Sequence, residues 1–308
     1  MKQEVSFNSK GETCRGVLWL PDDSRGPFPI LIMAGGWCYV KEIVMPHYAE
    51  RFVKEGIACL YFDYRCLGES SGTPRQHIDP WAQVEDYKNA ISFAEKHPDL
   101  DPARIGIWGI SYSGGHVLIV GATDPRIRCI VSNIPVVDGY KTLLRDHGER
   151  RFSQLRAEIL KDRRVRFENP NSVNYIPMST PDPENVLSTW PFPHVHSIFT
   201  QIKETEAPRH EHRNTIESVE MLLNYTVFPY AERILSTPTL MVVAEDDNIT
   251  SWDFEIAAFN SITSARKKLV TLPNVTHMSL YAQRSHLEIA AQEEAVWLRN
   301  NLVKSPDL

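Results

Sequence analysis

The stretch that decides the fold is residues 105–117, which read IGIWGISYSGGHV. An apolar, strand-like run leads directly into a turn that carries Ser111, and a run rich in small residues then begins a helix. A serine with small residues two positions before and after it, at a turn from strand to helix, is typical of a nucleophile held at the edge of a sheet. Larger residues at Gly109 or Ser113 would collide with neighbouring backbone in such a strained turn. The pattern therefore predicts Ser111 as a nucleophile. A phosphate-binding turn is disfavoured, because no lysine follows and the glycine spacing is wrong.

Strand and helix signals alternate on both sides of this stretch. The strands expected before residue 139 cover residues 4–7, 15–20, 30–34, 57–62, 104–108 and 129–132, and the helices cover 46–54, 81–96 and 111–120. This alternation is typical of a mostly parallel sheet with helices on both faces.

The alternation stops near residue 139 and resumes at residue 239. Residues 140–230 contain helical stretches without clear strands, and six prolines fall between residues 170 and 193. The strands expected afterwards cover 239–244 and 268–272, with helices at 253–261 and 285–301. We expect residues 1–139 and 231–308 to form one α/β core, with residues 140–230 as a helical cap or lid. An independent second domain is the alternative.

Composition excludes several classes of protein. The 308 residues contain 33 Lys and Arg against 39 Asp and Glu, a net charge of −6, and 42% are hydrophobic. This balance disfavours intrinsic disorder and nucleic-acid binding. We see no apolar run long enough for a membrane span and no secretory signal in MKQEVSFN. Five cysteines at irregular spacing argue against a disulfide framework, so we expect a cytoplasmic protein with no membrane or nucleic-acid partner.

A serine nucleophile needs a base. The place of each of the eleven histidines in the chain indicates which one can serve as that base. His277 follows the last strand-like run in LPNVTH, at the end of the sheet where a base can reach Ser111. His116 follows Ser111 by five residues on the helix and is expected to play a structural part. The remaining histidines weighed against His277 lie on the last helix or in the expected cap: His194, His196, His210, His212 and His286.

The base in turn needs a carboxylate that orients it, which is expected between the serine and the histidine along the chain. The strand at 239–244 runs into Glu245-Asp246-Asp247. Asp247 lies in the turn beyond the strand and can reach over to His277, so we predict it as the acid. Asp246, Asp253 and Asp138 are the alternatives.

An oxyanion requires two donors that do not reorganise during the reaction. We expect the amide of Tyr112, directly after the nucleophile, and the amide of Trp37, in the loop that follows residues 30–34. Glycines in that loop permit close backbone approach. Cys38 is rejected as a nucleophile because it does not lie in a turn from strand to helix of the kind that carries Ser111. Candidate residues of the substrate pocket are Gly36, Cys38, Trp190, Phe192 and His194.

The expected cap contains a basic segment, residues 145–168, with eight Lys or Arg and five Asp or Glu. Its positive charge can attract coenzyme A, an acidic carrier protein or a carboxylate substrate. A solvated helix with internal ion pairs is the alternative, and we favour it. Tyr175, Trp190, Phe192 and Phe199 either cover an acyl pocket or only pack the cap on the sheet.

Several of these motifs together resemble those of the α/β-hydrolase superfamily: DYR at 63–65, GES at 68–70, IGIWGISYSGGHV, AEDDNIT and LPNVTH. Residues 106–118, preceded by PRQHIDP at 74–80, are similar to the fungal polyketide transferase and thiohydrolase group, near dienelactone-hydrolase-like enzymes. The resemblance covers residues 25–135 and 235–303, and it implies triad and oxyanion positions for the five residues predicted above. Two departures are Gly35-Gly36 in place of the usual His-Gly, and Cys66 in place of a glycine.

We therefore expect a serine hydrolase that cleaves an ester, thioester or lactone of a small, polyketide-like acyl compound through an acyl-enzyme. Acyl transfer or lactone formation, and carbon–carbon hydrolysis, are alternatives with the same triad, and a non-catalytic ligand receptor is disfavoured. No cofactor or metal is expected. A thioester of coenzyme A or of a carrier protein is a candidate substrate. The oligomeric state stays open, with a dimer as one option.

Overall fold

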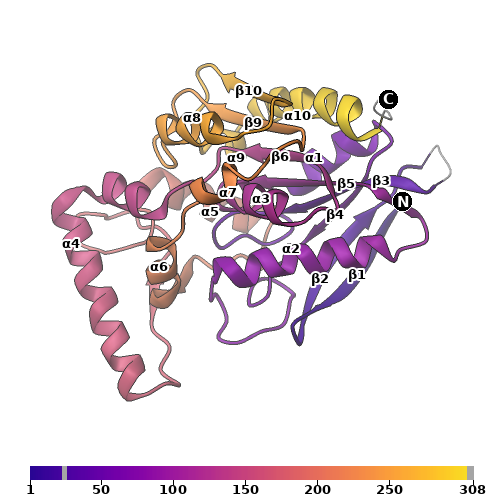
Figure 1. Cartoon of the computed structure of the whole chain (residues 1–308). Helices are drawn as coiled ribbons and strands as arrows, with labels where there is room; N and C mark the ends of the chain where they lie inside the picture. Colours follow the sequence, from indigo (N-terminus) through magenta and orange to yellow (C-terminus); the bar gives the residue numbers. More distant parts are fainter. Residues whose placement is uncertain (23–25, 304–308) are drawn as a thin grey trace.

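The computed structural model describes residues 1–22 and 26–303 of the chain. An eight-stranded sheet with the order β1-β2-β4-β3-β5-β6-β9-β10 forms its centre (Figure 1). Its strands are β1 (Lys2–Ser9), β2 (Glu12–Trp19), β3 (Phe28–Ala34), β4 (Ala58–Phe62), β5 (Leu100–Ile110), β6 (Ile127–Asn133), β9 (Thr239–Ala244) and β10 (Lys267–Leu272).

The sheet is mostly parallel, and its antiparallel pairs lie at one edge. β1 pairs antiparallel with β2, and β2 pairs antiparallel with β4. From β4 to β10 every neighbouring pair is parallel. All residues of β3, β4 and β9 are buried, as expected of strands covered on both faces. The predicted α/β fold is confirmed, and the sheet takes strands from both sides of residues 140–230.

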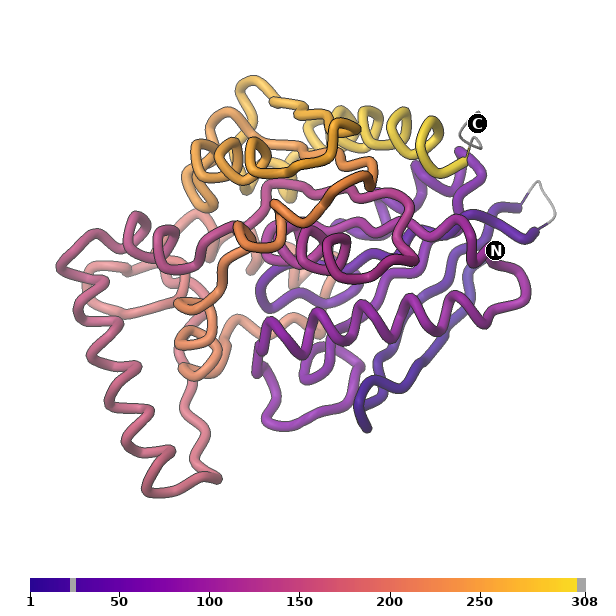
Figure 2. The backbone as a smooth tube through the Cα atoms, viewed as in Figure 1, coloured from indigo at the N-terminus to yellow at the C-terminus, as the bar shows by residue number. Residues whose placement is uncertain are grey.

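Helices cover both faces of the sheet (Figures 1 and 2). α2 packs against α3, and α1 packs against α10. The helices of the two layers and of the C-terminal region are α1 (Met45–Val53), α2 (Pro80–Glu95), α3 (Tyr112–Thr123), α8 (Trp252–Ser261), α9 (Ser279–Ala282) and α10 (Arg284–Leu298), and a short π-helix, η1 (Arg299–Val303), follows.

The chain between β6 and β9, here named the intervening segment, holds four helices and two short strands in the part that the structure describes. These are α4 (Gly139–Glu168), β7 (Tyr175–Pro177), α5 (Pro193–Thr205), β8 (Arg213–Thr215), α6 (Ile216–Leu223) and α7 (Phe228–Ala231). α4 is bent at Gly148, where φ is 66°, and its second part projects away from the sheet (Figure 2). β7 and β8 pair antiparallel.

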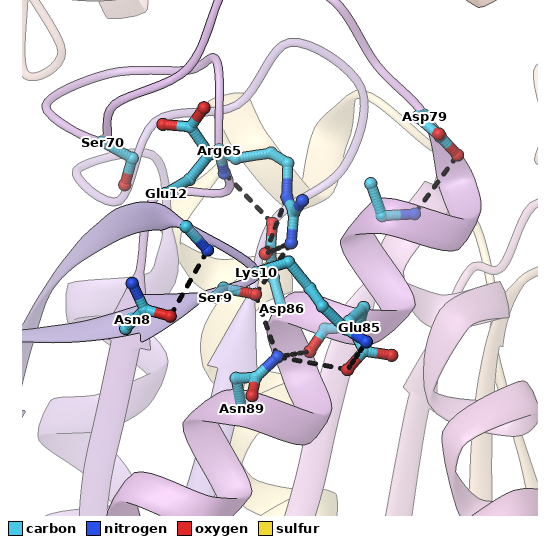
Figure 3. A network of polar contacts seen from close by, with 12 residues as sticks. Asn8, Ser9, Lys10, Glu12, Arg65, Ser70, Asp79, Glu85, Asp86 and Asn89 are labelled. Atoms are coloured by element: carbon cyan, nitrogen blue, oxygen red, sulfur yellow. Dashed lines mark hydrogen bonds and ion pairs between the residues drawn. The ribbon is translucent and has the colours of Figure 1, made fainter.

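A buried ion pair fixes the turn that follows β4 (Figure 3). The Arg65 guanidinium donates to Asp86 of α2 from Nε and Nη2, at 3.0 and 2.6 Å, and to Ser9 Oγ at 2.8 Å. The Arg65 backbone amide donates to the second oxygen of Asp86. Both oxygens of the buried Asp86 carboxylate are thereby satisfied, Oδ1 by the guanidinium and Oδ2 by the amide, and β1, α2 and the turn are joined.

No helix within residues 1–22 and 26–303 is both long enough and apolar enough to cross a membrane.

Candidate active site

Ser111 lies in a strained turn between β5 and α3. Its φ is 57° and its ψ is −117°, a conformation that L residues rarely adopt. Its amide donates to Asn133 O of β6 at 2.9 Å, and its carbonyl accepts from Val136 N at 3.0 Å. A Cβ at Gly109 would lie 2.2 Å from the carbonyl oxygen of Ser113, so only glycine fits there. The prediction that a larger residue at Gly109 would collide with neighbouring backbone is confirmed.

Ser113, at the second small position, has a polar function in the turn. Its hydroxyl donates to the carbonyl of Gly35 and also contacts Tyr64 Oη. The turn is thereby joined to the loops that follow β3 and β4. Gly36 brings the β3 loop close to the serine, because a Cβ at this position would lie 2.9 Å from Ser111 Cβ.

The structure brings the three predicted catalytic side chains into one hydrogen-bonded line. His277 Nε2 lies 3.2 Å from Ser111 Oγ, and His277 Nδ1 lies 2.7 Å from Asp247 Oδ2. All three residues are buried. Ser111 follows the carboxyl end of β5, Asp247 that of β9 and His277 that of β10. These strand ends meet at one edge of the sheet.

Asp247 is held as a carboxylate by its own loop. Its Oδ1 accepts from the amides of Ile249 and Thr250, each at 2.9 Å, and Thr250 Oγ1 lies 2.9 Å from its Oδ2. Burial raises the pKa of Asp247, but the neighbouring His277 and the two amides together lower the pKa below its ordinary value. The group therefore remains charged at neutral pH and can orient the His277 ring.

A second buried acid, Glu255, supports this arrangement from α8. Its Oε1 lies 2.7 Å from Thr250 Oγ1. Burial, followed by the charge of Asp247, raises the pKa of Glu255 well above its ordinary value. A protonated Glu255 donates to Thr250, which leaves the threonine proton free to bond Asp247. Sequence reasoning missed Thr250 and Glu255; a threonine three residues after the acid was the available signal.

The predicted oxyanion donors flank Ser111. Within the described ranges, the amides of Trp37 and Tyr112 donate to no carbonyl in a turn, loop or cap. Tyr112 opens α3, where the first amides have no partner inside the helix and the helix dipole favours negative charge. The Trp37 indole packs on Tyr112 at 5.1 Å and donates to Asn214 Oδ1 at 2.9 Å. Both residues stay predictions for the oxyanion hole.

A narrow cavity opens at Ser111 and His277. The intervening segment supplies four apolar residues of its wall, and the remaining wall comes from the loops of the sheet. The cavity is lined by Trp37, Tyr39, Ser111, Met178, Trp190, Val195, Phe199, Ile249, His277 and Met278. Its free volume of about 20 Å³ holds about one water molecule. The predicted aromatic residues Trp190 and Phe199 do line an apolar space. The prediction missed Tyr39, Met178, Val195, Ile249 and Met278.

Four predicted pocket residues do not line this cavity. Gly36 contributes close backbone approach, as described above. Cys38 is buried and points its thiol toward the Arg213 carbonyl, 3.4 Å away. Phe192 is half-buried against the exposed His194, with ring centroids 5.5 Å apart. Partial shielding of the His194 ring from water and then the nearby His277 lower the pKa of His194. His194 is therefore near the site but does not line the cavity.

The alternative histidines have other partners. His116 is buried, with Nδ1 2.9 Å from Tyr225 Oη and Nε2 2.9 Å from Gln83 Oε1, which is the structural part that was expected. His196, His210 and His212 form a cluster away from Ser111, in which His196 Nδ1 lies 3.0 Å from His212 Nε2. His286 is half-buried beside Ser279.

The alternative acids are also occupied elsewhere. Asp246 is exposed beside Asp247. Asp253 pairs with Arg145 of α4 at 2.5 Å. Asp138 caps α4 by accepting from the Lys141 amide at 3.0 Å.

The basic segment of α4 is largely paired. Five of its eight basic side chains meet carboxylates: Arg145 with Asp253, Arg150 with Glu184, Lys161 with Glu158, Arg163 with Glu220, and Arg166 with Asp162, Glu217 and Glu220. These pairs favour the solvated, ion-paired interpretation of the segment.

A larger hollow of about 830 Å³ lies at the opposite edge of the sheet, where β5 and β6 begin and β9 is entered. Ligands of open α/β sheets bind outside the carboxyl ends of the strands. Since Ser111 is at the carboxyl edge, we take the narrower cavity as the candidate active site.

Residues 13–175 match the family model described as X-Pro dipeptidyl-peptidase (S15 family). The chain belongs to the α/β-hydrolase superfamily through this family. The solved structure of the α/β-hydrolase GrgF from Penicillium sp. sh18 superimposes with a TM-score of 0.83 at 23% identity, over 99% of this chain and all of that one. The fold predicted from the motifs is thereby confirmed.

This α/β-hydrolase has named relatives in fungi and bacteria. It is 31% identical over 293 residues to the thiohydrolase aneE of Aspergillus aculeatus, covering 92% of this chain and 86% of that one. It is 28% identical over 305 residues to the polyketide transferase af380 of Aspergillus fumigatus, covering 98% and 99%. The match to the quorum-quenching protein AidA of Acinetobacter baumannii is 41% over 139 residues and spans only 45% of either chain. The predicted membership of the thiohydrolase and polyketide transferase group is confirmed, and the protein is an enzyme of this superfamily.

Proposed function

We propose that this enzyme is a serine hydrolase that cleaves an ester, thioester or lactone of a small acyl compound through an acyl-enzyme. The observation that carries the proposal is the hydrogen-bonded line from Ser111 Oγ through His277 to Asp247. His277 takes the proton of Ser111 Oγ as this oxygen attacks the acyl carbon. The histidine then gives the proton to the leaving group. Asp247 keeps the ring in the required tautomer and stabilises its charged form.

The second half of the reaction uses the same groups. After the leaving group departs, His277 Nε2 accepts a proton from water, which attacks the acyl carbon and releases Ser111. The amides of Trp37 and Tyr112 stabilise the oxyanion in both halves. The cavity beside Ser111 and His277 has room for one water molecule.

The apolar lining indicates an acyl group that is largely hydrocarbon. Since the relatives include a thiohydrolase and a polyketide transferase, we propose a polyketide-like acyl group, delivered as a thioester of coenzyme A or of a carrier protein. We also propose that residues 140–230 act as a cap over the core, because one sheet takes strands from both sides of this segment. All five cysteines are free and buried, which agrees with a reducing compartment such as the cytoplasm.

The test removes the nucleophile. Ser111→Ala should lower kcat by several orders of magnitude on thioester and ester substrates, and it should abolish labelling by a fluorophosphonate probe. A short burst with wild-type protein should add the mass of one acyl group, located on Ser111 by peptide mass spectrometry. Retention of most activity in a folded Ser111→Ala variant would overturn the proposal.

Acyl transfer is the second candidate, because one relative of similar length is named a polyketide transferase and an apolar lining keeps most water away from an acyl-enzyme. Product analysis with and without an added alcohol or amine distinguishes the two. Ester or amide products that rise with acceptor concentration would indicate a transferase, and free acid alone would indicate a hydrolase.

A further inference from the structure

Tyr281, four residues after His277, packs directly on the base. It lies on α9, and its ring stacks on the His277 imidazole with centroids 5.8 Å apart and planes 28° apart. Its other neighbours are Tyr39, edge-on at 5.5 Å, and Phe199 at 6.0 Å, both of which line the cavity. Tyr281 therefore packs against three residues of the cavity lining, His277, Tyr39 and Phe199.

The phenolic oxygen of Tyr281 is buried and has no hydrogen-bond partner among residues 1–22 and 26–303. Burial raises the pKa of Tyr281, and the neighbouring Tyr39 and Ser111 hydroxyls oppose this rise only in part. The hydroxyl therefore stays protonated at neutral pH and is a donor. A buried donor without a partner is unfavourable, and such groups in native proteins call for an explanation.

The stacking of the His277 and Tyr281 rings indicates where the Tyr281 hydroxyl lies. The imidazole meets Ser111 through Nε2, and the phenol hydroxyl is also a neighbour of Ser111. Because the rings are stacked and both reach the same serine, the hydroxyl adjoins the Nε2 end of His277. In a serine hydrolase this is where the leaving group receives its proton and where the entering water or alcohol gives one up.

We propose that the Tyr281 hydroxyl donates a hydrogen bond to the atom that leaves the acyl carbon, and later to the oxygen that enters. This inference rests on the proposed acyl-enzyme function and adds a catalytic residue to it. In acylation the bond from Ser111 Oγ to the acyl carbon forms, and the bond to the leaving atom breaks. His277 moves the serine proton to the leaving atom, while Tyr281 keeps its own proton. In deacylation the entering oxygen bonds to the acyl carbon and gives its proton to His277. The bond from that carbon to Ser111 Oγ then breaks, and His277 returns the proton to Ser111.

The role makes a specific demand on the leaving group. An alkoxide oxygen gathers charge as the bond breaks and accepts a strong hydrogen bond, whereas thioether-like sulfur is a weak acceptor. An aryloxide is stable without help. Loss of the hydroxyl should therefore slow acylation by alkyl esters far more than acylation by thioesters or aryl esters of the same acyl group.

The experiment compares Tyr281→Phe with the wild type on three substrates that share one acyl group: an alkyl ester, an aryl ester and a thioester. Single-turnover acylation of the alkyl ester should fall on the order of 10-fold to 100-fold, and acylation by the other two should fall less than about threefold. The ratio of two acylation rates in one protein sample does not depend on the fraction that is folded.

Tyr48→Phe is the matched control. Tyr48 on α1 is fully buried, its hydroxyl is likewise unpaired in the described part of the chain, and its ring packs on Trp108 at 4.8 Å. The control should leave the ratio of alkyl-ester to thioester rates within a factor of two of the wild type. Equal losses on all three substrates in Tyr281→Phe would overturn this inference while Ser111→Ala stays inactive. Activity in Ser111→Ala would instead overturn the proposed function.

Discussion

The two sides of the cavity are built in opposite ways. The side formed by the sheet loops carries Ser111, Asp247 and His277, whose polar atoms are joined by hydrogen bonds. The side formed by the intervening segment presents Met178, Trp190, Val195 and Phe199, which contact the site through hydrocarbon and aromatic surface.

This difference shows that the polar side of the cavity requires precise geometry, whereas the apolar side does not. Hydrogen bonds depend steeply on distance and angle, so the polar side needs rigid supports such as the β5–α3 turn and the Asp247 loop. Apolar contacts are non-directional, so the opposite side can change its shape and keep its stability if volume is preserved. We therefore expect changes on the polar side to alter the chemistry, and changes on the apolar side to alter which acyl group is accepted.

The largest expected effect is that of Asp247→Asn. The substitution removes the charge that stabilises the imidazolium and favours the wrong tautomer of His277, so kcat should fall about 10⁴-fold. Steady-state kinetics on one thioester measures the loss. The control is Asp246→Asn, at the exposed neighbouring acid, which should stay within about threefold of the wild type. A larger loss of kcat in Asp246→Asn than in Asp247→Asn would contradict the assignment of Asp247 as the acid that orients His277.

The next effect concerns the support of the polar side. Glu294 of α10 accepts hydrogen bonds from Trp108 of β5 and Asn133 of β6, each at 2.6 Å. Burial raises the pKa of Glu294 from 4.5 to about 8, although both donors oppose the rise. The folded protein thus keeps this proton up to about pH 8, whereas the unfolded chain loses it near its ordinary value.

Glu294 should therefore make the fold most stable at low pH and less stable as the pH rises from about 4.5 to 8, by a few kcal/mol at most. Glu294→Gln cannot ionise, so its melting temperature should fall less than that of the wild type between pH 5 and pH 8. Glu293→Gln, at the half-exposed neighbour, should retain the wild-type slope. Parallel curves for the wild type and Glu294→Gln would show that the buried acid is not the cause.

The smallest expected effect is on the apolar side. Met178→Ala enlarges the cavity without touching the polar groups, so the ratio of kcat/KM for a longer acyl chain to that for a short one should rise about tenfold. An acyl-length series measures this ratio. Met221→Ala, on α6 and outside the cavity lining, should leave it unchanged. An equal fall for every chain length would mean that this side does not select the acyl group.

Local pattern predicted much of the molecule. The elbow around Ser111 has steric requirements that act over a few residues, so its glycine and its strand-to-helix change are visible in the sequence. Asp247 and His277 follow buried strands, and the carboxyl ends of parallel strands meet at one edge. Their order along the chain was therefore enough to predict the hydrogen-bonded line that the structure contains.

Residues that matter through their neighbours were not predicted. Tyr39, Glu255 and Tyr281 stand in no motif, and each acquires its environment from a distant element. Cys38 and Phe192 were expected at the pocket because of their place in the chain, yet the folded loops turn them elsewhere. The direction of a side chain depends on backbone angles at each turn, which residue type alone does not specify.

The sequence by itself determined the α/β fold, the strained serine turn and the edge of the sheet where the polar side chains gather, because these follow from short-range sterics and hydrophobic periodicity. Only the tertiary structure decided that Met178, Trp190, Val195 and Phe199 line the cavity at Ser111, that Glu255 supports Asp247 through Thr250, and that the Tyr281 ring stacks on His277. These contacts join segments far apart in the chain, and their energies arise from packing and burial that exist only after the chain has folded.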